Sequence, residues 1–186
     1  MTKLFNTGIF VSLLFFGFVS EKQGAGKQED YVCMPCGSEC DKQTHSGPGK
    51  CSECGMELVK KSTVKQKNIE PKDLCAYVSG LGSGNVLLLD VRTTAEFEGK
   101  AGDKFGRLSN AVNIPVQELA QRLKELDGWK DKPIVVYCSH SHRSPRASYI
   151  LSQNGFTNVT NMLGGMSVWK NSVKDADCNR KLFISQ

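Results

Sequence analysis

Short apolar runs and amphipathic segments alternate along the second two-thirds of the chain. Three runs have the length and composition of buried strands: 86–91 (VLLLDV), 133–137 (PIVVY) and 157–162 (TNVTNM). Three segments are predicted as helices: 74–78 (LCAYV), 115–126 (PVQELAQRLKEL) with an apolar face, and a stretch from Ser144 as N-cap to Gly155. Strands that alternate with helices indicate an α/β domain with a parallel sheet over about residues 68–173.

The first twenty residues have the pattern of an export signal. Lys3 supplies a positive start, and residues 9–19 (IFVSLLFFGFV) form an apolar run that is shorter than the roughly 20 residues needed to span a bilayer. Ser20 is a plausible last residue before cleavage, but Phe18 stands where a small residue is expected. The pattern therefore predicts export to the periplasm or cell envelope. An uncleaved anchor is the alternative, and only that alternative places the chain at a membrane.

Changes in composition divide the rest of the chain. Residues 21–30 and 60–71 are polar, so we expect them to be linkers on either side of a Cys-rich segment at 31–59. The α/β domain is then expected at 72–173, followed by a polar tail at 174–186.

Composition limits the classes of function. Of the 186 residues, 39% are hydrophobic and 23% are charged, which is typical of a globular protein. The formal net charge of +5 is spread over the whole chain and forms no basic stripe, so we expect no nucleic-acid partner.

The strongest chemical signal lies in residues 134–155 (IVVYCSHSHRSPRASYILSQNG). An apolar strand brings Cys138 to its carboxyl end, where open α/β sheets bind ligands. Loop amides and the N-terminus of the next helix can point at the sulfur, and Arg143 adds a full positive charge. All three favour thiolate over thiol, so Cys138 is a candidate nucleophile. The alternative is a buried Cys at a strand end beside a surface Arg.

Residues 72–170 resemble the rhodanese family of sulfurtransferases. The resemblance rests on four segments: 87–98 (LLLDVRTTAEFE), 109–119 (SNAVNIPVQEL), 133–144 (PIVVYCSHSHRS) and 155–170 (GFTNVTNMLGGMSVWK). It implies a rhodanese-like parallel sheet flanked by helices, and no organic cofactor. It also implies that Cys138 attacks the sulfane sulfur of thiosulfate or a persulfide, keeps it as a persulfide, and passes it to cyanide, a thiol or a protein acceptor.

The loop after Cys138 is the predicted substrate site. Its residues are Ser139, His140, Ser141, His142, Arg143 and Ser144, with Arg143 implied by the resemblance as the residue that holds an oxyanion. Four residues separate Cys138 from Arg143, as in rhodaneses, whereas related dual-specificity phosphatases have five, so phosphatase chemistry is disfavoured.

Two features of this loop leave its activity open. Ser141 stands where the family commonly has Gly, and it costs about 1 kcal/mol if that position needs a positive φ. His140 and His142 either donate to an anionic substrate or are solvated side chains without a catalytic role. A non-catalytic rhodanese domain that handles metals or senses redox state is therefore the alternative function.

Four further residues are expected to have structural roles. Asp90 and Arg92 lie at the carboxyl end of a strand and are interpreted as hydrogen-bonding supports for neighbouring loops, with catalysis by Asp90 as the alternative, and Glu96 is interpreted in the same way. Cys75, on an apolar helix face, is expected to be an inert buried thiol.

Cys178 lies in the polar tail and has two interpretations. It either reaches Cys138 as a thiol that accepts its sulfur or forms a disulfide with it, or it packs with Leu182 and Phe183 as a small apolar residue.

The Cys-rich segment contains two Cys-x-x-Cys-Gly motifs, in YVCMPCG (31–37) and GKCSECGMELV (49–59). Their spacing predicts a metal site, most simply structural zinc, held by Cys33, Cys36, Cys51 and Cys54. Gly37 and Gly55 allow tight turns whose amides reach the sulfurs. Cys40 and His45 are alternative ligands.

The same segment resembles the small heavy-metal-binding domains often attached to metal-efflux proteins, mainly through GPGKCSECGMELV at 47–59. Met34 and Met56 beside the thiolates suit a soft cation such as Cu(I) as well as zinc. Disulfide formation after export and a mobile thiol segment are the alternatives to metal binding.

Overall fold

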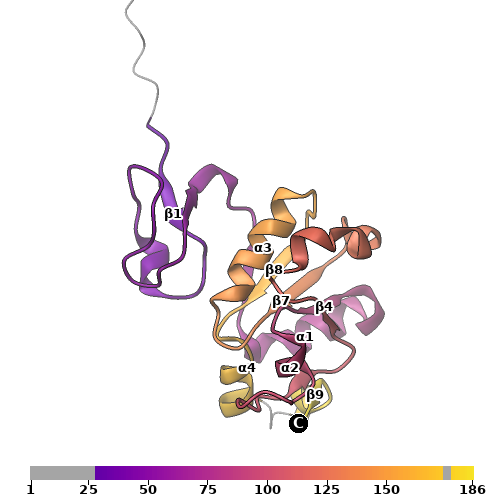
Figure 1. Cartoon of the computed structure of the whole chain (residues 1–186). Coiled ribbons are helices and arrows are strands. Elements are labelled where there is room, and N and C mark those ends of the chain that lie inside the picture. The colour runs from indigo at the N-terminus through magenta and orange to yellow at the C-terminus, as the bar shows by residue number, and fades with distance from the viewer. Residues whose placement is uncertain (1–27, 174–176) are drawn as a thin grey trace, which may run out of the picture.

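A parallel five-stranded β-sheet forms the centre of the structure, a computed structural model that describes residues 28–173 and 177–186 (Figure 1). The strands lie in the order β3-β8-β7-β4-β6 and all neighbours run parallel. Their bounds are β3 Lys67–Ile69, β4 Leu87–Asp90, β6 Val112–Asn113, β7 Ile134–Tyr137 and β8 Val159–Met162. The α/β parallel-sheet prediction is confirmed.

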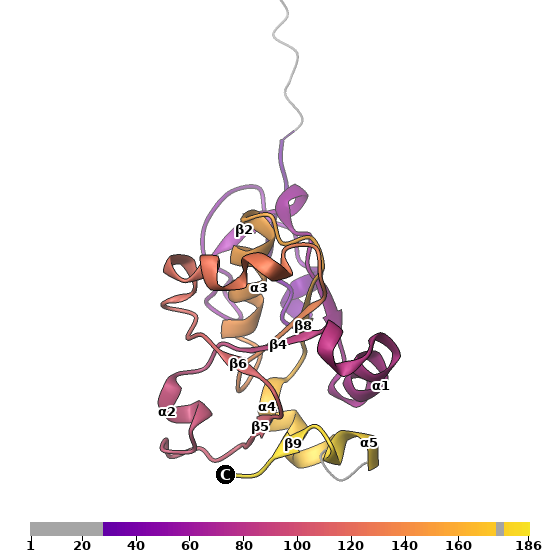
Figure 2. The same cartoon turned by 90° about the vertical axis from the view of Figure 1, so that its right-hand side faces the viewer.

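Helices cover both faces of this sheet (Figures 1 and 2). Ile134 and Val136 of β7 pack on the face covered by α3, whereas Val135 packs on the face covered by α1. Because both faces are buried, β4 and β7 are almost entirely apolar instead of alternating. The helices are α1 Pro71–Leu81, α2 Thr94–Phe97, α3 Arg143–Gln153, α4 Gly165–Val168 and α5 Asp177–Arg180.

The predicted export signal lies outside the described residues. Within the ranges that the structure describes, no helix has both the length and the apolar character needed to cross a membrane.

The helix predicted at 115–126 is wrong. The chain instead forms two successive 3-10 segments, Leu119–Gln121 and Leu123–Trp129. Arg122 separates them with φ −108° and ψ 10°, while its guanidinium bonds Glu118 and Glu125. Leu119 and Leu126 are still buried. Apolar spacings of three and four residues do not distinguish these tight turns from a continuous helix.

Part of the predicted linker at 60–71 belongs to the sheet. Lys67–Ile69 forms the edge strand β3, and Pro71 begins α1. Lys67 and Asn68 are exposed, and only Ile69 packs against the core. A polar edge strand carries little apolar signal, which explains why the sequence pattern missed it.

The C-terminal tail is ordered where it is described. Strand β9 (Phe183–Ile184) pairs antiparallel with β5 (Arg107–Leu108), and Leu182 and Phe183 pack against the core on the α1 face. Cys178 forms a disulfide with Cys75 on α1. Cys178 therefore neither reaches Cys138 nor packs as a free apolar thiol, so both interpretations of Cys178 are wrong. The prediction that Cys75 is an inert thiol is wrong as well.

Breaking this disulfide should lower stability. The Cys75–Cys178 bond closes a loop across 103 positions, and constraining so long a loop in the unfolded chain is expected to contribute about 2–4 kcal/mol. We expect a loss of that size for Cys178→Ser, measured by urea unfolding without reductant. Dithiothreitol should bring the parent protein to the stability of the variant, and equal stability of the two proteins before reduction would contradict the pairing.

The Cys-rich segment forms a small unit beside α3, which we call the Cys module (residues 28–60) (Figure 1). Its strands β1 (Tyr31–Cys33) and β2 (Leu58–Lys60) pair antiparallel. Its only buried cluster consists of cysteines, with Met56 and Leu58 packed against them. So small a unit has too little apolar core to be stable without a cross-link or a bound ion.

Candidate functional site

Cys138 directly follows β7, at the carboxyl end of a central strand. Its side chain is 1% exposed, and its Sγ lies 3.4 Å from Ser144 Oγ. The backbone amide of Met166 donates to the Cys138 carbonyl at 2.8 Å, so that α4 packs against the loop. A Cβ on Gly165 would lie 2.3 Å from that carbonyl oxygen. Gly165 was missed as a site residue, although the Gly-Gly pair at 164–165 was a signal of close backbone approach.

The loop turns at Ser141, which has a φ of +61° and is buried. This is the left-handed region, in which the absence of a Cβ makes glycine the favoured residue. Ser141 Oγ reaches the Met162 carbonyl only at 3.5 Å, so little hydrogen-bond energy offsets the strain.

Replacing Ser141 by Gly is therefore expected to stabilise the protein by about 1 kcal/mol. Urea unfolding of Ser141→Gly against the parent measures the gain. Asn110, the other described non-glycine residue with positive φ, provides a matched comparison, because Asn tolerates φ +57° better than Ser does and Asn110→Gly should gain less. A loss of stability in Ser141→Gly would contradict the strain.

The two loop histidines point into different surroundings. Both are exposed, and His140 packs edge-on against the Phe105 ring at 5.2 Å. His140 lines a 280 Å³ cavity, whereas His142 lines a separate cavity of 350 Å³. The loop therefore does not bring them to a common point.

Arg143 begins α3, one residue before the predicted N-cap at Ser144. Its two Nη atoms donate to the Glu96 carboxylate at 2.6 and 2.7 Å, and Nη2 also donates to Ser139 Oγ at 2.9 Å. The Arg143 guanidinium holds the pKa of Glu96 well below its usual range. Arg143, expected to hold an oxyanion, is thus already engaged by a carboxylate.

Glu96 is positioned by the start of α2. The Thr93 backbone N–H donates to the Glu96 side chain, and the Glu96 backbone N–H donates to Thr93 Oγ1. This reciprocal pair is a capping box, whose T-x-x-E spacing at 93–96 was visible in the sequence. It directs the carboxylate toward Ser139 and Arg143, a charge partnership that sequence analysis did not foresee.

Asp90 and Arg92 form a fully buried ion pair, with Arg92 Nη2 2.6 Å from Asp90 Oδ2. Arg92 Nη2 also donates to the Gly106 carbonyl, and Asn113 Nδ2 donates to the carbonyls of Asp90 and Arg92. These bonds join the end of β4 to the residue before β5 and to the last residue of β6. They hold the neighbouring loops together.

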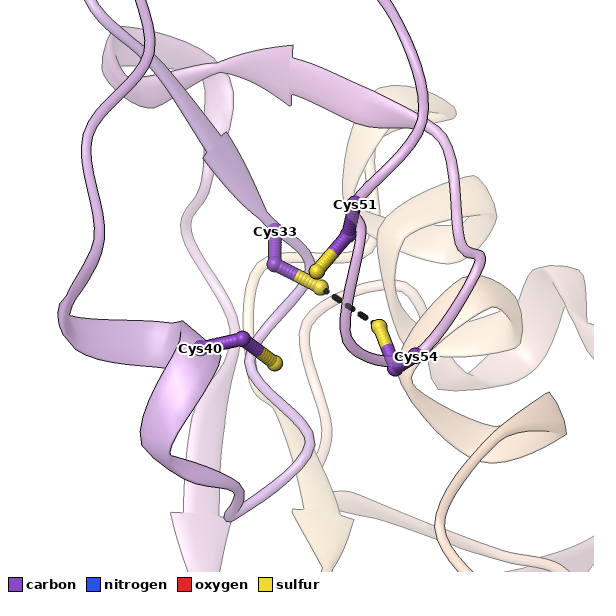
Figure 3. Close-up of side chains that lie close together, drawn as sticks. All are labelled: Cys33, Cys40, Cys51 and Cys54. Carbon is purple, nitrogen blue, oxygen red and sulfur yellow. Dashed lines mark hydrogen bonds between the residues drawn. The ribbon is translucent and has the colours of Figure 1, made fainter.

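The Cys module brings four thiols together (Figure 3). The Sγ atoms of Cys33, Cys40, Cys51 and Cys54 all lie within 4.8 Å of one another, and Cys33 and Cys54 are 3.2 Å apart. Cys40 thus joins the cluster where Cys36 was expected, because the 3-10 turn Glu39–Lys42 buries it there. Cys36 Sγ instead lies 3.4 Å from Asp41 Oδ1. His45 pairs through its backbone with Tyr31.

The electrostatics of this cluster suit a cation. Burial raises the pKa of the Cys33 thiol and brings that of Cys40 to about 12. The backbone amide of Cys54 lowers the pKa of Cys51 to about 7. A cation that replaces the thiol protons would offset part of the thiolate charge that forms, and an all-sulfur donor set fits zinc or Cu(I). Gly37 and Gly55 have φ of +90° and +71° at the turns after the two motifs.

The Cys module lies directly against the loop after Cys138. The 350 Å³ cavity is lined from the module by Met34, Lys50, Cys54, Gly55, Met56 and Glu57, and from the α/β domain by Val116, Gln117, His142, Arg143 and Arg146. Cys36 and Gly37 line the 280 Å³ cavity together with His140 and Ser141. Asn161 also donates to the Pro35 carbonyl. Two segments far apart in sequence therefore share both cavities.

The domain is thus a parallel α/β sheet that carries a buried cysteine at the end of a central strand, followed by a loop and a helix that begins with Arg. The model of the rhodanese-like domain matches residues 76–172, more than half of the chain. The chain therefore belongs to the rhodanese family.

Similar proteins include sulfurtransferases. The chain is 34% identical over 85 residues to a sulfurtransferase of Allochromatium vinosum, covering 46% of this chain and 72% of that protein. It is 41% identical over 87 residues to the uncharacterized protein YqhL of Bacillus subtilis, covering 47% of this chain and 63% of that protein. A rhodanese-related structure from Thermoplasma volcanium shares 32% identity with a TM-score of 0.44, covering 55% of this chain and 89% of that one. The match to the Allochromatium vinosum protein supports a general sulfurtransferase assignment.

Proposed function

We propose that this protein is a sulfurtransferase that moves sulfane sulfur through a persulfide on Cys138. The observation that carries the proposal is the position of Cys138, which is buried at the end of β7 and separated by four residues from Arg143 at the start of α3. In that position a helix N-terminus, a guanidinium and loop amides would favour the thiolate of Cys138 as a nucleophile.

The reaction has two steps. The Cys138 thiolate attacks the sulfane sulfur of thiosulfate, a new S–S bond forms, the original S–S bond breaks, and sulfite leaves with the bonding electron pair. A thiol or cyanide then attacks the outer sulfur of the persulfide, and Cys138 leaves as thiolate. Ser144 Oγ, 3.4 Å from the sulfur, is placed to donate to the thiolate. Arg143 and the loop amides would hold the anionic donor.

The burial of Cys138 favours small sulfur compounds as donors, or a slender group on a thiol or protein acceptor. We further propose that the protein acts in the periplasm or cell envelope after export, and that its Cys module holds zinc or a soft metal such as copper. Cys33, Cys40, Cys51 and Cys54 would hold that ion.

The test is conversion of thiosulfate and cyanide to thiocyanate by the purified protein. Mass spectrometry after thiosulfate alone should show one added sulfur atom, in a peptide that contains Cys138. Absence of both signals in reduced, folded protein would refute the proposal.

A second candidate function is a non-catalytic rhodanese domain in metal handling or redox sensing. One argument for it is the ion pair with Glu96, which neutralises the positive charge of the Arg143 guanidinium. The other is that the Cys module packs against the loop after Cys138. This alternative predicts no thiocyanate production, with metal binding intact.

A further inference from the structure

The Cys module holds more ligand atoms than one tetrahedral ion can use. Besides the four-thiol group of Cys33, Cys40, Cys51 and Cys54, a second group consists of Cys33, Cys36, Cys40 and Asp41. The ligand atoms of each group lie within 4.8 Å of one another. Tetrahedral zinc with Zn–S bonds of about 2.3 Å places its sulfurs roughly 3.8 Å apart, so both groups are close to the size of a metal site.

The two groups share Cys33 and Cys40. A thiolate sulfur has several lone pairs and can bind two cations at once. Two four-coordinate ions need eight metal–ligand bonds, and the six donors of the combined groups supply that number when two of them bridge. The donor count of the module thus matches a pair of ions.

Asp41 is held in place to act as a ligand. Its Oδ2 accepts backbone N–H bonds from Cys36 at 2.9 Å and Gly37 at 2.7 Å. Its Oδ1 faces the Cys36 thiol, which donates to it at 3.4 Å. The proton between Cys36 and Asp41 therefore marks a position that a cation can take, with the carboxylate already oriented by the amides.

Charge also favours the second ion. Cys33, Cys36, Cys40 and Cys51 are all no more than 5% exposed, so uncompensated charge among them is costly. One divalent ion in the four-thiolate group leaves two thiolate charges uncompensated, with the Asp41 charge next to them. A second divalent ion adds two positive charges, and the Cys36 thiol that binds it becomes a thiolate. The net charge of the whole cluster is therefore less negative by one. Sharing Cys33 and Cys40 further spreads the charge of each bridging sulfur over two cations.

From these contacts we infer that the Cys module binds two soft divalent ions as one dinuclear centre. Cys51 and Cys54 bind only the first ion, Cys36 and Asp41 bind only the second, and Cys33 and Cys40 bridge them. The inference rests on the proposed metal binding of the module and deepens it by fixing stoichiometry and ligand sharing.

The experiment is a Cd²⁺ titration of the full-length, reduced protein, followed by native mass spectrometry. We expect two bound ions in the parent protein and one in both Cys36→Ser and Asp41→Asn. Glu39→Gln is the matched control, because Glu39 is an exposed carboxylate of the same turn, bonds Lys42 and belongs to neither group. It should retain two ions.

Bridging is tested separately by ¹¹³Cd NMR of the fully loaded protein. Two resonances with mutual scalar coupling are expected, because a shared thiolate connects the two nuclei. One ion in the parent protein, two ions retained in Cys36→Ser, or two uncoupled resonances would each overturn the dinuclear centre. A parent protein that binds no ion would instead refute metal binding as a whole, so the two failures are distinguishable.

Discussion

Cys138→Ser is expected to abolish persulfide formation and to lower thiosulfate turnover by at least about three orders of magnitude. The sulfur atom of Cys138 both attacks the donor and carries the transferred sulfur, and a serine hydroxyl can do neither at neutral pH. The added sulfur atom seen by mass spectrometry after thiosulfate treatment should disappear from the Cys138 peptide. Thiocyanate production measures the loss of turnover.

The control for this prediction must separate Cys138 from the other free thiols. Cys51→Ser removes a buried thiol of the Cys module that lines neither cavity beside the loop, and it should leave sulfur loading at Cys138 intact. The fold of Cys138→Ser should survive, because Ser144 Oγ at 3.4 Å gives the new hydroxyl a hydrogen-bond partner. Turnover retained in a folded Cys138→Ser protein would rule out the mechanism.

The central strands and the cysteine loop could be predicted from the sequence because their signals are local. Leu87–Asp90 and Ile134–Tyr137 are apolar runs that only a doubly covered sheet accommodates. The spacing of Cys138, Arg143 and the following helix also lies within one short stretch. The positive φ at Ser141 agreed with the conformation that the family's usual glycine implied.

The features that the sequence did not reveal are pairings between distant residues. The Cys75–Cys178 bond joins a helix to a polar tail, and neither segment carries a pattern that specifies the other. Cys40 lies outside both Cys-x-x-Cys motifs and joins the thiol cluster only because a short 3-10 turn buries it. Spacing rules identify ligand-rich segments, but the ligand set depends on how the loops fold back.

The Glu96–Arg143 pair was missed for a similar reason, and it has two expected consequences. Arg143→Lys keeps the charge but loses the planar fork, so KM for thiosulfate should rise about 10-fold. Glu96→Gln removes the negative charge that neutralises Arg143, so KM should fall several-fold. Steady-state kinetics of the two variants should therefore move in opposite directions from the parent protein. A higher KM in both variants would mean that Arg143 only positions the loop.

The free energy of unfolding tests the Glu96–Arg143 pair independently of kinetics, because Glu96→Gln leaves the half-buried Arg143 without its counter-ion. We expect the variant to lose about 1–3 kcal/mol at neutral pH. In the unfolded chain the Glu96 carboxyl has an ordinary pKa of about 4.3, and in the folded protein Arg143 lowers that pKa. The folded state therefore binds fewer protons, and the contribution of the pair is fully present above pH 4.3 and declines as the pH falls toward the folded value. Urea unfolding from pH 7 to pH 3 should show the difference between parent and variant shrinking with acid. A difference that is constant across that range would show that the lost stability does not come from the charge of Glu96.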